Sequence, residues 1–118
     1  MIGIDIIEID RIESVLARFG DRFTSKIFTE SECAYCDASA KPSERYAARF
    51  AAKEAIAKVV KDGPSGWYWR QIEIQKQESG APKVVLSGEL RASYPHQIVV
   101  SFSHSRDYVA AVALQVGS

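Results

Sequence analysis

The sequence has few cysteines, few histidines and no long apolar run, and each shortage excludes a class of protein. Its 118 residues contain only two cysteines, four prolines and seven glycines, too few for a disulfide-stapled, collagen-like or low-complexity chain. No apolar run reaches the roughly 18 residues of a membrane-spanning helix, so we expect no membrane partner. The first residues also lack the basic-then-apolar order of a signal peptide, and the cytosol is the expected compartment.

The charges balance, which removes another set of partners. Fifteen lysines and arginines offset fifteen aspartates and glutamates, so the net charge is zero and no global field attracts nucleic acid. We therefore predict no nucleic-acid partner, and any anion must be bound by a local cluster of cations. With 47% hydrophobic and 25% charged residues, the composition is that of a globular protein, and the length predicts a single domain over residues 1–118.

The two cysteines are spaced C-x-x-C, at Cys33 and Cys36. A redox pair of this spacing normally follows a strand, and a zinc site needs two more ligands nearby. The only histidines, His96 and His104, are distant in the sequence. We expect a reduced pair that packs as small apolar side chains on a helix.

Helix signals dominate the first half of the chain. They follow a short strand at residues 2–7, in which Ile2, Ile4 and Ile6 face one way and Gly3, Asp5 and Ile7 the other. The expected helices are residues 10–20, with Asp10 as N-cap and Gly20 as the stop; residues 29–38, opened by the capping box from Thr29 to Glu32; and residues 44–61, with Ser43 as cap.

Strand signals dominate the second half. Alternation predicts strands at residues 69–75 and 83–86 around a turn at 78–82, and at 97–103 and 108–116 around residues 104–107, with a short helix at 88–94. Helices early and strands late favour an α+β fold, in which an antiparallel sheet packs against one long and several shorter helices.

The segment RFAAKEAIAKVV, residues 49–60, combines small residues with charges. At about 100° per residue its alanines form a core-facing stripe, with Glu54 and Lys58 on one flank, Arg45 and Arg49 on the opposite flank, and Lys53 on the outer side. Taken alone, Glu54 and Lys58 fit an ordinary surface ion pair. The alanines, however, allow a strand to approach the helix closely beside these two charges.

Asp5 gives the helix charges a second interpretation. An acid on an otherwise apolar strand needs backbone donors, a basic partner or a metal ion. If Asp5 and Glu54 converge, they supply part of an octahedral Mg²⁺ shell and leave positions for water and phosphate oxygens. Lys58 would then neutralise one phosphate and Arg49 grip another, which favours phosphoryl or pyrophosphate chemistry over acyl transfer.

His104 ends a predicted strand between Ser103 and Ser105. A serine nucleophile is not indicated, because neighbours on a strand face opposite ways and the chain has no G-x-S-x-G motif. Anion binding is the functional role that suits these donors; a structural role is the alternative.

Three parts of the sequence together resemble a known family. They are GIDIIEIDRI at residues 3–12, RFTSKIFTESE with ERYAARFAAKEAIAKV at residues 22–32 and 44–59, and VSFSHSRDYVAAVA at residues 100–113. Over nearly its whole length the chain resembles the small holo-acyl carrier protein synthases, a class of 4'-phosphopantetheinyl transferases. The G-x-D and F-x-x-K-E-A-x-x-K elements are the most specific part of the match.

The resemblance implies a homotrimer of α+β subunits that binds coenzyme A in clefts between subunits. The serine of an apo acyl carrier protein would attack the β-phosphorus of coenzyme A, releasing adenosine 3',5'-bisphosphate. The family's Mg²⁺ ligands fall on Asp5 and Glu54, and its phosphate-facing lysine, which assists the leaving group, falls on Lys58. These three are the candidate catalytic residues; the base that deprotonates the serine is open between Glu54 and a metal-bound water.

The resemblance also assigns the two substrates to residues. Arg49, His104 and Ser105 match positions that contact the nucleotide end of coenzyme A, including its 3'-phosphate, and Pro82 matches a proline at the adenine pocket. The surface that receives the acidic helix of the carrier protein falls on Arg11, Arg22 and Phe23.

One segment departs from the family pattern. A glycine-bearing turn normally follows soon after the helix lysine, whereas here Lys61 precedes a glycine delayed to Gly63. The aromatic run at residues 67–69 is expected to pack in the core or between subunits.

Two other functions stay open: a metal-dependent pyrophosphohydrolase that uses the same carboxylates, and a non-catalytic trimeric binding module in which they form a buried ionic network.

Overall fold

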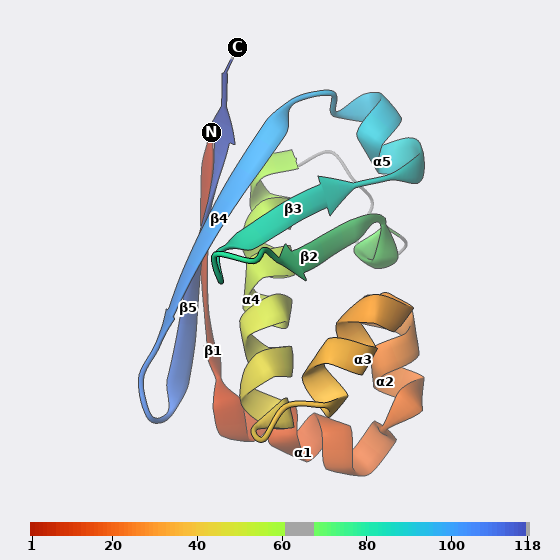
Figure 1. Ribbon diagram of the computed structural model, residues 1–118, viewed down its shortest axis with the longest axis vertical. Coiled ribbons are helices and arrows are strands. Elements are labelled where there is room, and N and C mark those ends of the chain that lie inside the picture. Colours follow the sequence, from red (N-terminus) through yellow and green to blue (C-terminus); the bar gives the residue numbers. More distant parts are fainter. Residues whose placement is uncertain (61–67, 118) are drawn as a thin grey trace.

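The computed structural model describes residues 1–60 and 68–117, and its central element is the helix α4 (Pro42–Val60). A three-stranded antiparallel sheet covers one side of α4, in the order β1 (Ile2–Glu8), β5 (Tyr108–Val116), β4 (Gln97–His104) (Figure 1). A separate hairpin, β2 (Ile72–Lys76) and β3 (Pro82–Leu86), lies on its other side. The predicted α+β class is confirmed, with the strands divided between two sheets.

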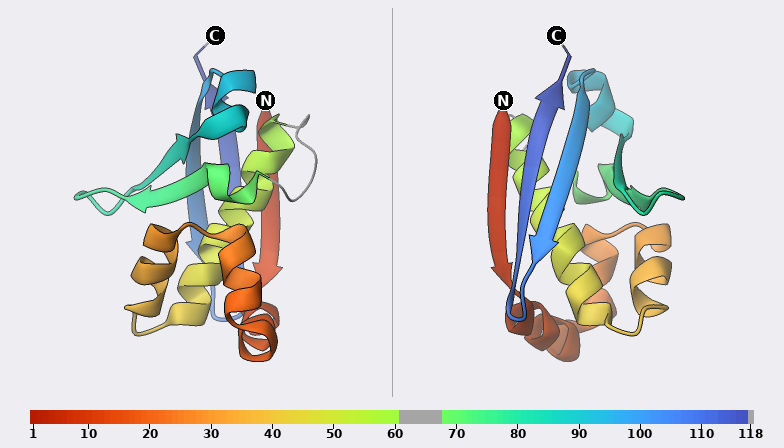
Figure 2. Two further views of the ribbon diagram at one scale, coloured as in Figure 1. Left: turned by 90° about the vertical axis from the view of Figure 1, so that its right-hand side faces the viewer. Right: turned by 60° about the vertical axis from the view of Figure 1, so that its left-hand side comes forward.

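The shorter helices complete the covering of α4. They are α1 (Ile9–Phe19), α2 (Asp21–Ile27), α3 (Glu30–Asp37) and α5 (Gly88–Ser93), with a 3₁₀ turn at Trp69–Gln71. Figure 2 shows α1, α2 and α3 gathered around one end of α4, on the side away from the sheet. As a result α4 is buried on almost every side, which its many alanines permit.

A glycine sets the contact between β1 and α4. A Cβ atom built on Gly3 would lie 2.1 Å from the carbonyl oxygen of Ala55, far inside van der Waals contact. The predicted stripe of α4, which includes Ala51, Ala52 and Ala55, is fully buried at this junction. The strand therefore approaches the helix backbone more closely than any other residue at position 3 allows.

Two predicted helix starts are wrong, for different reasons. Asp10 is not an N-cap: α1 begins at Ile9, whose amide donates to the carbonyl of Asp107 at 2.8 Å, so a distant turn replaces a side-chain cap. Ser43 is not a cap either, because α4 begins one residue earlier, at Pro42. Proline suits a first helical position, since it has no amide hydrogen to leave unpaired.

Two further differences from the predicted elements concern α2 and the start of β2. The helix α2 was not predicted; it follows directly where Gly20 ends α1 at φ 50°. Trp69 to Gln71 form the 3₁₀ turn rather than the start of the strand, which begins at Ile72. The predicted capping box of α3 is confirmed, with reciprocal hydrogen bonds between Thr29 and Glu32.

The cysteine prediction agrees with the structure. Cys33 and Cys36 lie on α3, both are free thiols, and Cys36 is fully buried. Burial raises the pKa of the Cys36 thiol to about 12, so it stays protonated at neutral pH and serves as core packing. Among the described residues, no helix has the length and apolar character needed to cross a membrane.

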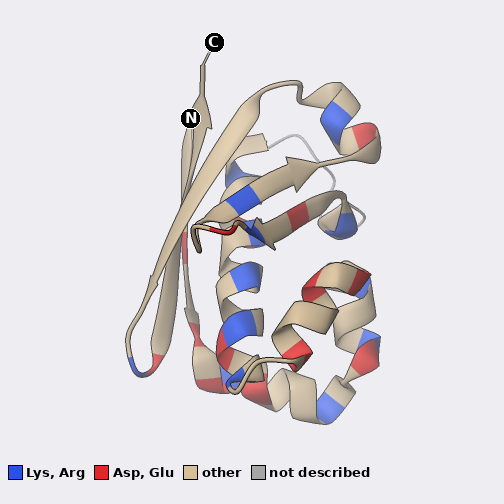
Figure 3. Cartoon of the chain, viewed as in Figure 1, with Lys and Arg blue, Asp and Glu red and all other residues tan. Residues whose placement is uncertain are grey.

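The outer face of the sheet is apolar and exposed. Seven large apolar side chains share it: Ile2, Ile4 and Ile6 from β1, Tyr108, Val112 and Leu114 from β5, and Val99 from β4. Figure 3 shows that β4 and β5 carry no lysine, arginine, aspartate or glutamate. An exposed apolar face of this extent is typical of a protein-protein interface.

Candidate functional site

The close contact between β1 and α4 brings Asp5 to the flank of the helix. Lys58 Nζ donates to the carbonyl of Ile4 at 2.6 Å and lies 3.6 Å from Asp5 Oδ1. The Asp5 side chain is 18% exposed and that of Lys58 is 54% exposed. The lysine therefore reaches across the junction and leaves its ammonium group accessible to a ligand.

Glu54 faces the same junction. Burial raises the pKa of its carboxyl group, and the negative charge of Asp5 raises it further, while Lys58 and Arg11 oppose the shift. A cation bound beside Glu54 would stabilise its ionised form against both effects. The structure thus brings together Asp5, Glu54 and Lys58, as the sequence predicted, with Arg11 near enough to influence Glu54.

This donor set fits a magnesium ion. Carboxylate oxygens are the ligands that Mg²⁺ prefers, and it commonly takes only one or two of them and fills its octahedron with water and phosphate oxygens. Within residues 1–60 and 68–117 no cluster of three or more histidines, cysteines or acids can hold a metal. Asp5 and Glu54 therefore suit an ion that is shared with a phosphate ligand better than a closed structural metal site.

A cationic pocket of about 280 Å³ lies where α3, α4, β4 and the hairpin meet. Arg49 and Pro82 both line it, as the predicted nucleotide site requires. Arg49 is buried, its guanidinium lies 4.2 Å from the centre of the Tyr35 ring, and its Nε has no hydrogen-bond partner among the described residues. A buried cationic donor without an acceptor is costly, so this pocket is suited to an anion.

His104 and Ser105 lie in a different hollow. It has a volume of about 490 Å³, and Ile6 and Tyr108 of the exposed sheet face also line it. His104 Nε2 is 3.2 Å from Glu44 Oε1, which links the end of β4 to the start of α4. The sequence grouped His104 and Ser105 with Arg49 in one nucleotide site; within one chain the structure divides them between two cavities.

The helix α4 also separates the cation site from the cationic pocket. Arg49 and Lys58 are nine positions apart on α4, which at about 100° per residue places them on opposite faces. The β1 edge of the sheet lies beside Lys58, and the β4 edge, with Phe102, lies beside Arg49. One chain therefore presents the two halves of the predicted site in opposite directions.

A groove between α1 and α2 contains Arg22 and Phe23. It has a volume of about 300 Å³ and is lined by Val15, Phe19, Arg22, Phe23, Lys26 and Ile27. Arg18 and Arg22 each lie over the Phe19 ring, at 5.2 and 5.7 Å. Arg11 is exposed earlier on α1 and does not line the groove. The sequence missed Lys26 because it did not predict α2, and it predicted Phe19 on the first helix without assigning it to the groove.

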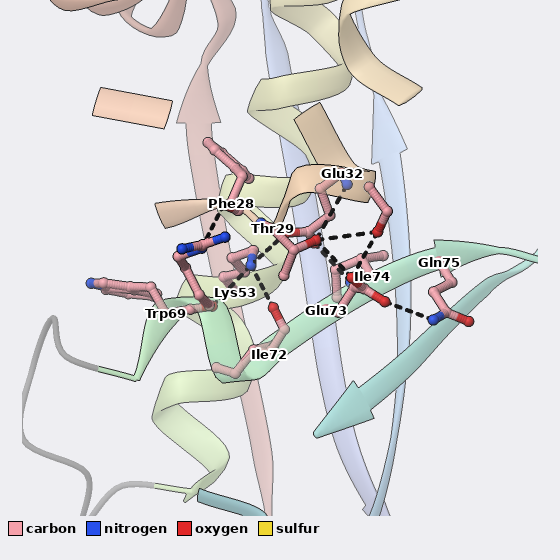
Figure 4. Close-up of polar contacts among 11 residues, drawn as sticks. Phe28, Thr29, Glu32, Lys53, Trp69, Ile72, Glu73, Ile74 and Gln75 are labelled. Atoms are coloured by element: carbon pink, nitrogen blue, oxygen red, sulfur yellow. Dashed lines mark hydrogen bonds and ion pairs between the residues drawn. The ribbon is translucent and has the colours of Figure 1, made fainter. Parts of the chain in front are cut away.

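The predicted position of Lys53 on the helix is wrong. It was expected on the outer side of the helix, but it is fully buried and lies 2.7 Å from Glu32, which is also buried (Figure 4). Burial lowers the pKa of the Lys53 ammonium, and the charge of Glu32 opposes this shift. A helical wheel with one apolar face cannot find such a residue, because α4 is covered on both sides.

Comparison with known proteins identifies the family. The sequence profile of the 4'-phosphopantetheinyl transferase superfamily matches residues 1–113. The chain belongs to this superfamily. Among curated phosphopantetheinyl transferases it is 46% identical to the holo-[acyl-carrier-protein] synthase of Chlamydia trachomatis, over 96% of each chain. It is 43% identical to that of Moorella thermoacetica, over 95% of this chain and 90% of the relative.

Solved phosphopantetheinyl transferases share the fold. The Helicobacter pylori holo-[acyl-carrier-protein] synthase, solved with coenzyme A, superposes with a TM-score of 0.85 at 32% identity, covering 98% of this chain and 100% of that one. The Bacillus anthracis enzyme gives a TM-score of 0.80 at 34% identity, covering 99% and 96%. Each match covers nearly all of both chains.

Proposed function

We propose that this protein is a holo-[acyl-carrier-protein] synthase that acts in the cytosol. It transfers 4'-phosphopantetheine from coenzyme A to a serine of an apo acyl carrier protein and releases adenosine 3',5'-bisphosphate. The serine oxygen forms a bond to the β-phosphorus, the bond from that phosphorus to the bridging oxygen breaks, and the serine proton is lost. The observation that carries the proposal is the junction of Asp5, Glu54 and Lys58, in a chain that resembles these enzymes from end to end.

The residues of the junction divide into two cation ligands and one phosphate-facing lysine. Asp5 and Glu54 would hold Mg²⁺, which supplies charge withdrawal from the pyrophosphate when it is bound. Lys58 places its ammonium beside the leaving phosphate and neutralises the charge that develops there. The carbonyl of Ile4, 2.6 Å from Lys58 Nζ, fixes the direction of that ammonium.

The nucleotide end of coenzyme A is assigned to the residues beyond the junction. Arg49 would bind a phosphate through its buried guanidinium, since its Nε has no partner within the described residues, and Pro82 would contact the adenine in the same pocket. His104 and Ser105 supply further donors to the 3'-phosphate from the hollow beside the exposed sheet face.

A homotrimer joins these halves. In a closed ring each subunit offers its β1 edge, with Asp5, to the β4 edge of the next, so the cation site of one chain meets the nucleotide residues of another. The exposed face that contains Ile4 and Val112 supplies the apolar area for this contact. The division of the site by α4 is the reason that one chain alone is insufficient.

The acyl carrier protein would dock in the groove between α1 and α2. Its acidic helix meets Arg22 and the apolar wall formed by Phe23 and Ile27, and positive charge steers the encounter. Arg11 lies on α1, nearer Glu54, so it would contact the carrier close to the reacting serine.

The test incubates the protein with coenzyme A, Mg²⁺ and apo acyl carrier protein and weighs the carrier by mass spectrometry. We expect a gain of one phosphopantetheine, which Glu54→Gln abolishes while the fold is kept. Glu89→Gln, on the exposed first turn of α5, is the matched control and should transfer normally. An unmodified carrier, or hydrolysis of the pyrophosphate without a carrier, contradicts the proposal; the second result favours the pyrophosphohydrolase.

A further inference from the structure

A buried ion pair joins three elements behind the cationic pocket. Lys53 on α4 and Glu32 on α3 lie 2.7 Å apart, and neither side chain is exposed. Lys53 Nζ also donates to the carbonyl of Trp69 at 2.9 Å and to that of Ile72, where β2 begins. All three ammonium hydrogens therefore have acceptors inside the protein (Figure 4).

Glu32 is bound just as completely. Its Oε2 accepts from the amide of Ile74 on β2 at 2.8 Å, and its Oε1 accepts from the amide of Thr29 at 2.9 Å. Beside them, Glu73 accepts from the hydroxyls of Thr29 and Ser31 at 2.6 and 2.7 Å. Charge-assisted hydrogen bonds shielded from water are directional, so α3, α4 and β2 are held in one relative placement.

The cationic pocket is built on the same three elements, one step away. Arg49 is one turn before Lys53 on α4, Tyr35 is one turn after Glu32 on α3, and Lys76 is two residues after Ile74 on β2. Arg49 and Lys76 lie 4.2 and 5.8 Å from the Tyr35 ring centre. A small shift of any one element would change the spacing of these cations.

We propose that Glu32 and Lys53 are positioning residues for the nucleotide pocket, which hold Arg49, Tyr35 and Lys76 at the spacing that a phosphate-bearing nucleotide requires. The proposal rests on the proposed use of coenzyme A. Apolar side chains would fill the same volume, but they carry no directional bonds to fix the three elements. The pocket binds the end of coenzyme A that is remote from the reacting phosphorus, so the pair acts on binding and not on the chemical step.

The test uses the double variant Glu32→Gln with Lys53→Met, which removes both charges and leaves neither one buried alone. We expect the KM for coenzyme A to rise about tenfold, the size of effect typical of residues that support a binding site from behind. The kcat at saturating coenzyme A and the KM for the carrier should stay within about twofold of the wild-type values, as remote binding predicts. The preference for coenzyme A over dephospho-coenzyme A should fall, because the pocket cations recognise the phosphate.

The control is Leu90→Ala in the buried face of α5, which lowers stability without touching the pocket and should leave the KM for coenzyme A unchanged. A folded double variant with a wild-type KM and a wild-type preference overturns the proposal. If the double variant does not fold, Glu73→Gln weakens the hydrogen-bond network around Glu32 and Lys53 instead. An unchanged KM for coenzyme A in that variant is equally decisive against the proposal.

Failure of the proposed function gives a different result. In that case the wild-type protein itself modifies no carrier. Titration calorimetry with adenosine 3',5'-bisphosphate then compares the wild type with the double variant directly. Tight binding to the first and weak binding to the second supports the positioning role, and equal affinities refute it.

Discussion

Replacing Gly3 by alanine should separate the strand from the helix and disable the cation site. The added Cβ would lie 2.1 Å from the carbonyl oxygen of Ala55 and 3.1 Å from the Cβ of Lys58. Neither the helix carbonyl nor a backbone-anchored Cβ can swing aside, so β1 must retreat by about 1 Å. Asp5, two residues along β1, retreats with it from Glu54 and Lys58.

The expected losses differ in size between stability and activity. Overpacking costs about 1–3 kcal/mol, which lowers the Tm of a domain of this length by roughly 4 °C per kcal/mol. A displacement of about 1 Å at a catalytic group costs on the order of 100-fold in rate. Transfer to the carrier, assayed well below the Tm of the variant, should therefore fall far more than the folded fraction does.

A control variant separates strain from displacement. Gly88→Ala places a Cβ 2.9 Å from the flexible side chain of Gln71, at a φ of +60°, so it loses stability on α5 but leaves β1 in place. It should lower the Tm and keep full transfer activity. If Gly3→Ala keeps transfer within about threefold of the wild type, the argued role of the contact between β1 and α4 is wrong.

Two further predictions concern the pH dependence and the assembly. Because the pKa of Glu54 is raised, the folded, metal-free protein binds a proton on this carboxyl group more tightly than the unfolded chain does. The free energy of unfolding should therefore fall as pH rises from about 4.5 through the raised pKa. Thermal melts in EDTA should show this fall for the wild type and a smaller one for Glu54→Gln; equal curves would contradict it. Ile4→Lys, at a side chain that is 57% exposed, should dissociate the proposed trimer in light scattering and lower transfer, whereas Ala92→Lys on α5 should do neither.

The sequence predicted those parts of the fold in which local chemistry decides the structure. The alternation of β1 is visible within its own seven residues, and the capping box of α3 joins Thr29 to Glu32, only three residues apart. The start of α1 was not predictable, since the amide of Ile9 is satisfied by Asp107, almost a hundred residues away. The helix α2 was not predicted, because a helix of seven residues is too short to show a clear apolar stripe.

The candidate site divides in the same way. Asp5, Glu54 and Lys58 were predicted to meet because one strand and one helix determine their geometry. The burial of Lys53 depends on Glu32, Trp69 and Ile72, which come from segments that no helical periodicity relates to α4. The departure from the family pattern at Lys61 and the expected packing of Trp67 lie outside the described residues. Tyr68 is buried in the core and stacks on Trp69, as expected for this run.

The two working faces of α4 make each chain a contributor to two active sites in the proposed ring. A chain with Glu54→Gln is defective only at the junction where it supplies the cation ligands, and a chain with Arg49→Met only where it supplies the nucleotide pocket. When the two inactive variants are unfolded together and reassembled, any ring that contains both has one junction in which both halves are intact. Mixing two dead proteins should therefore restore transfer, up to about a third of the sites in each mixed ring.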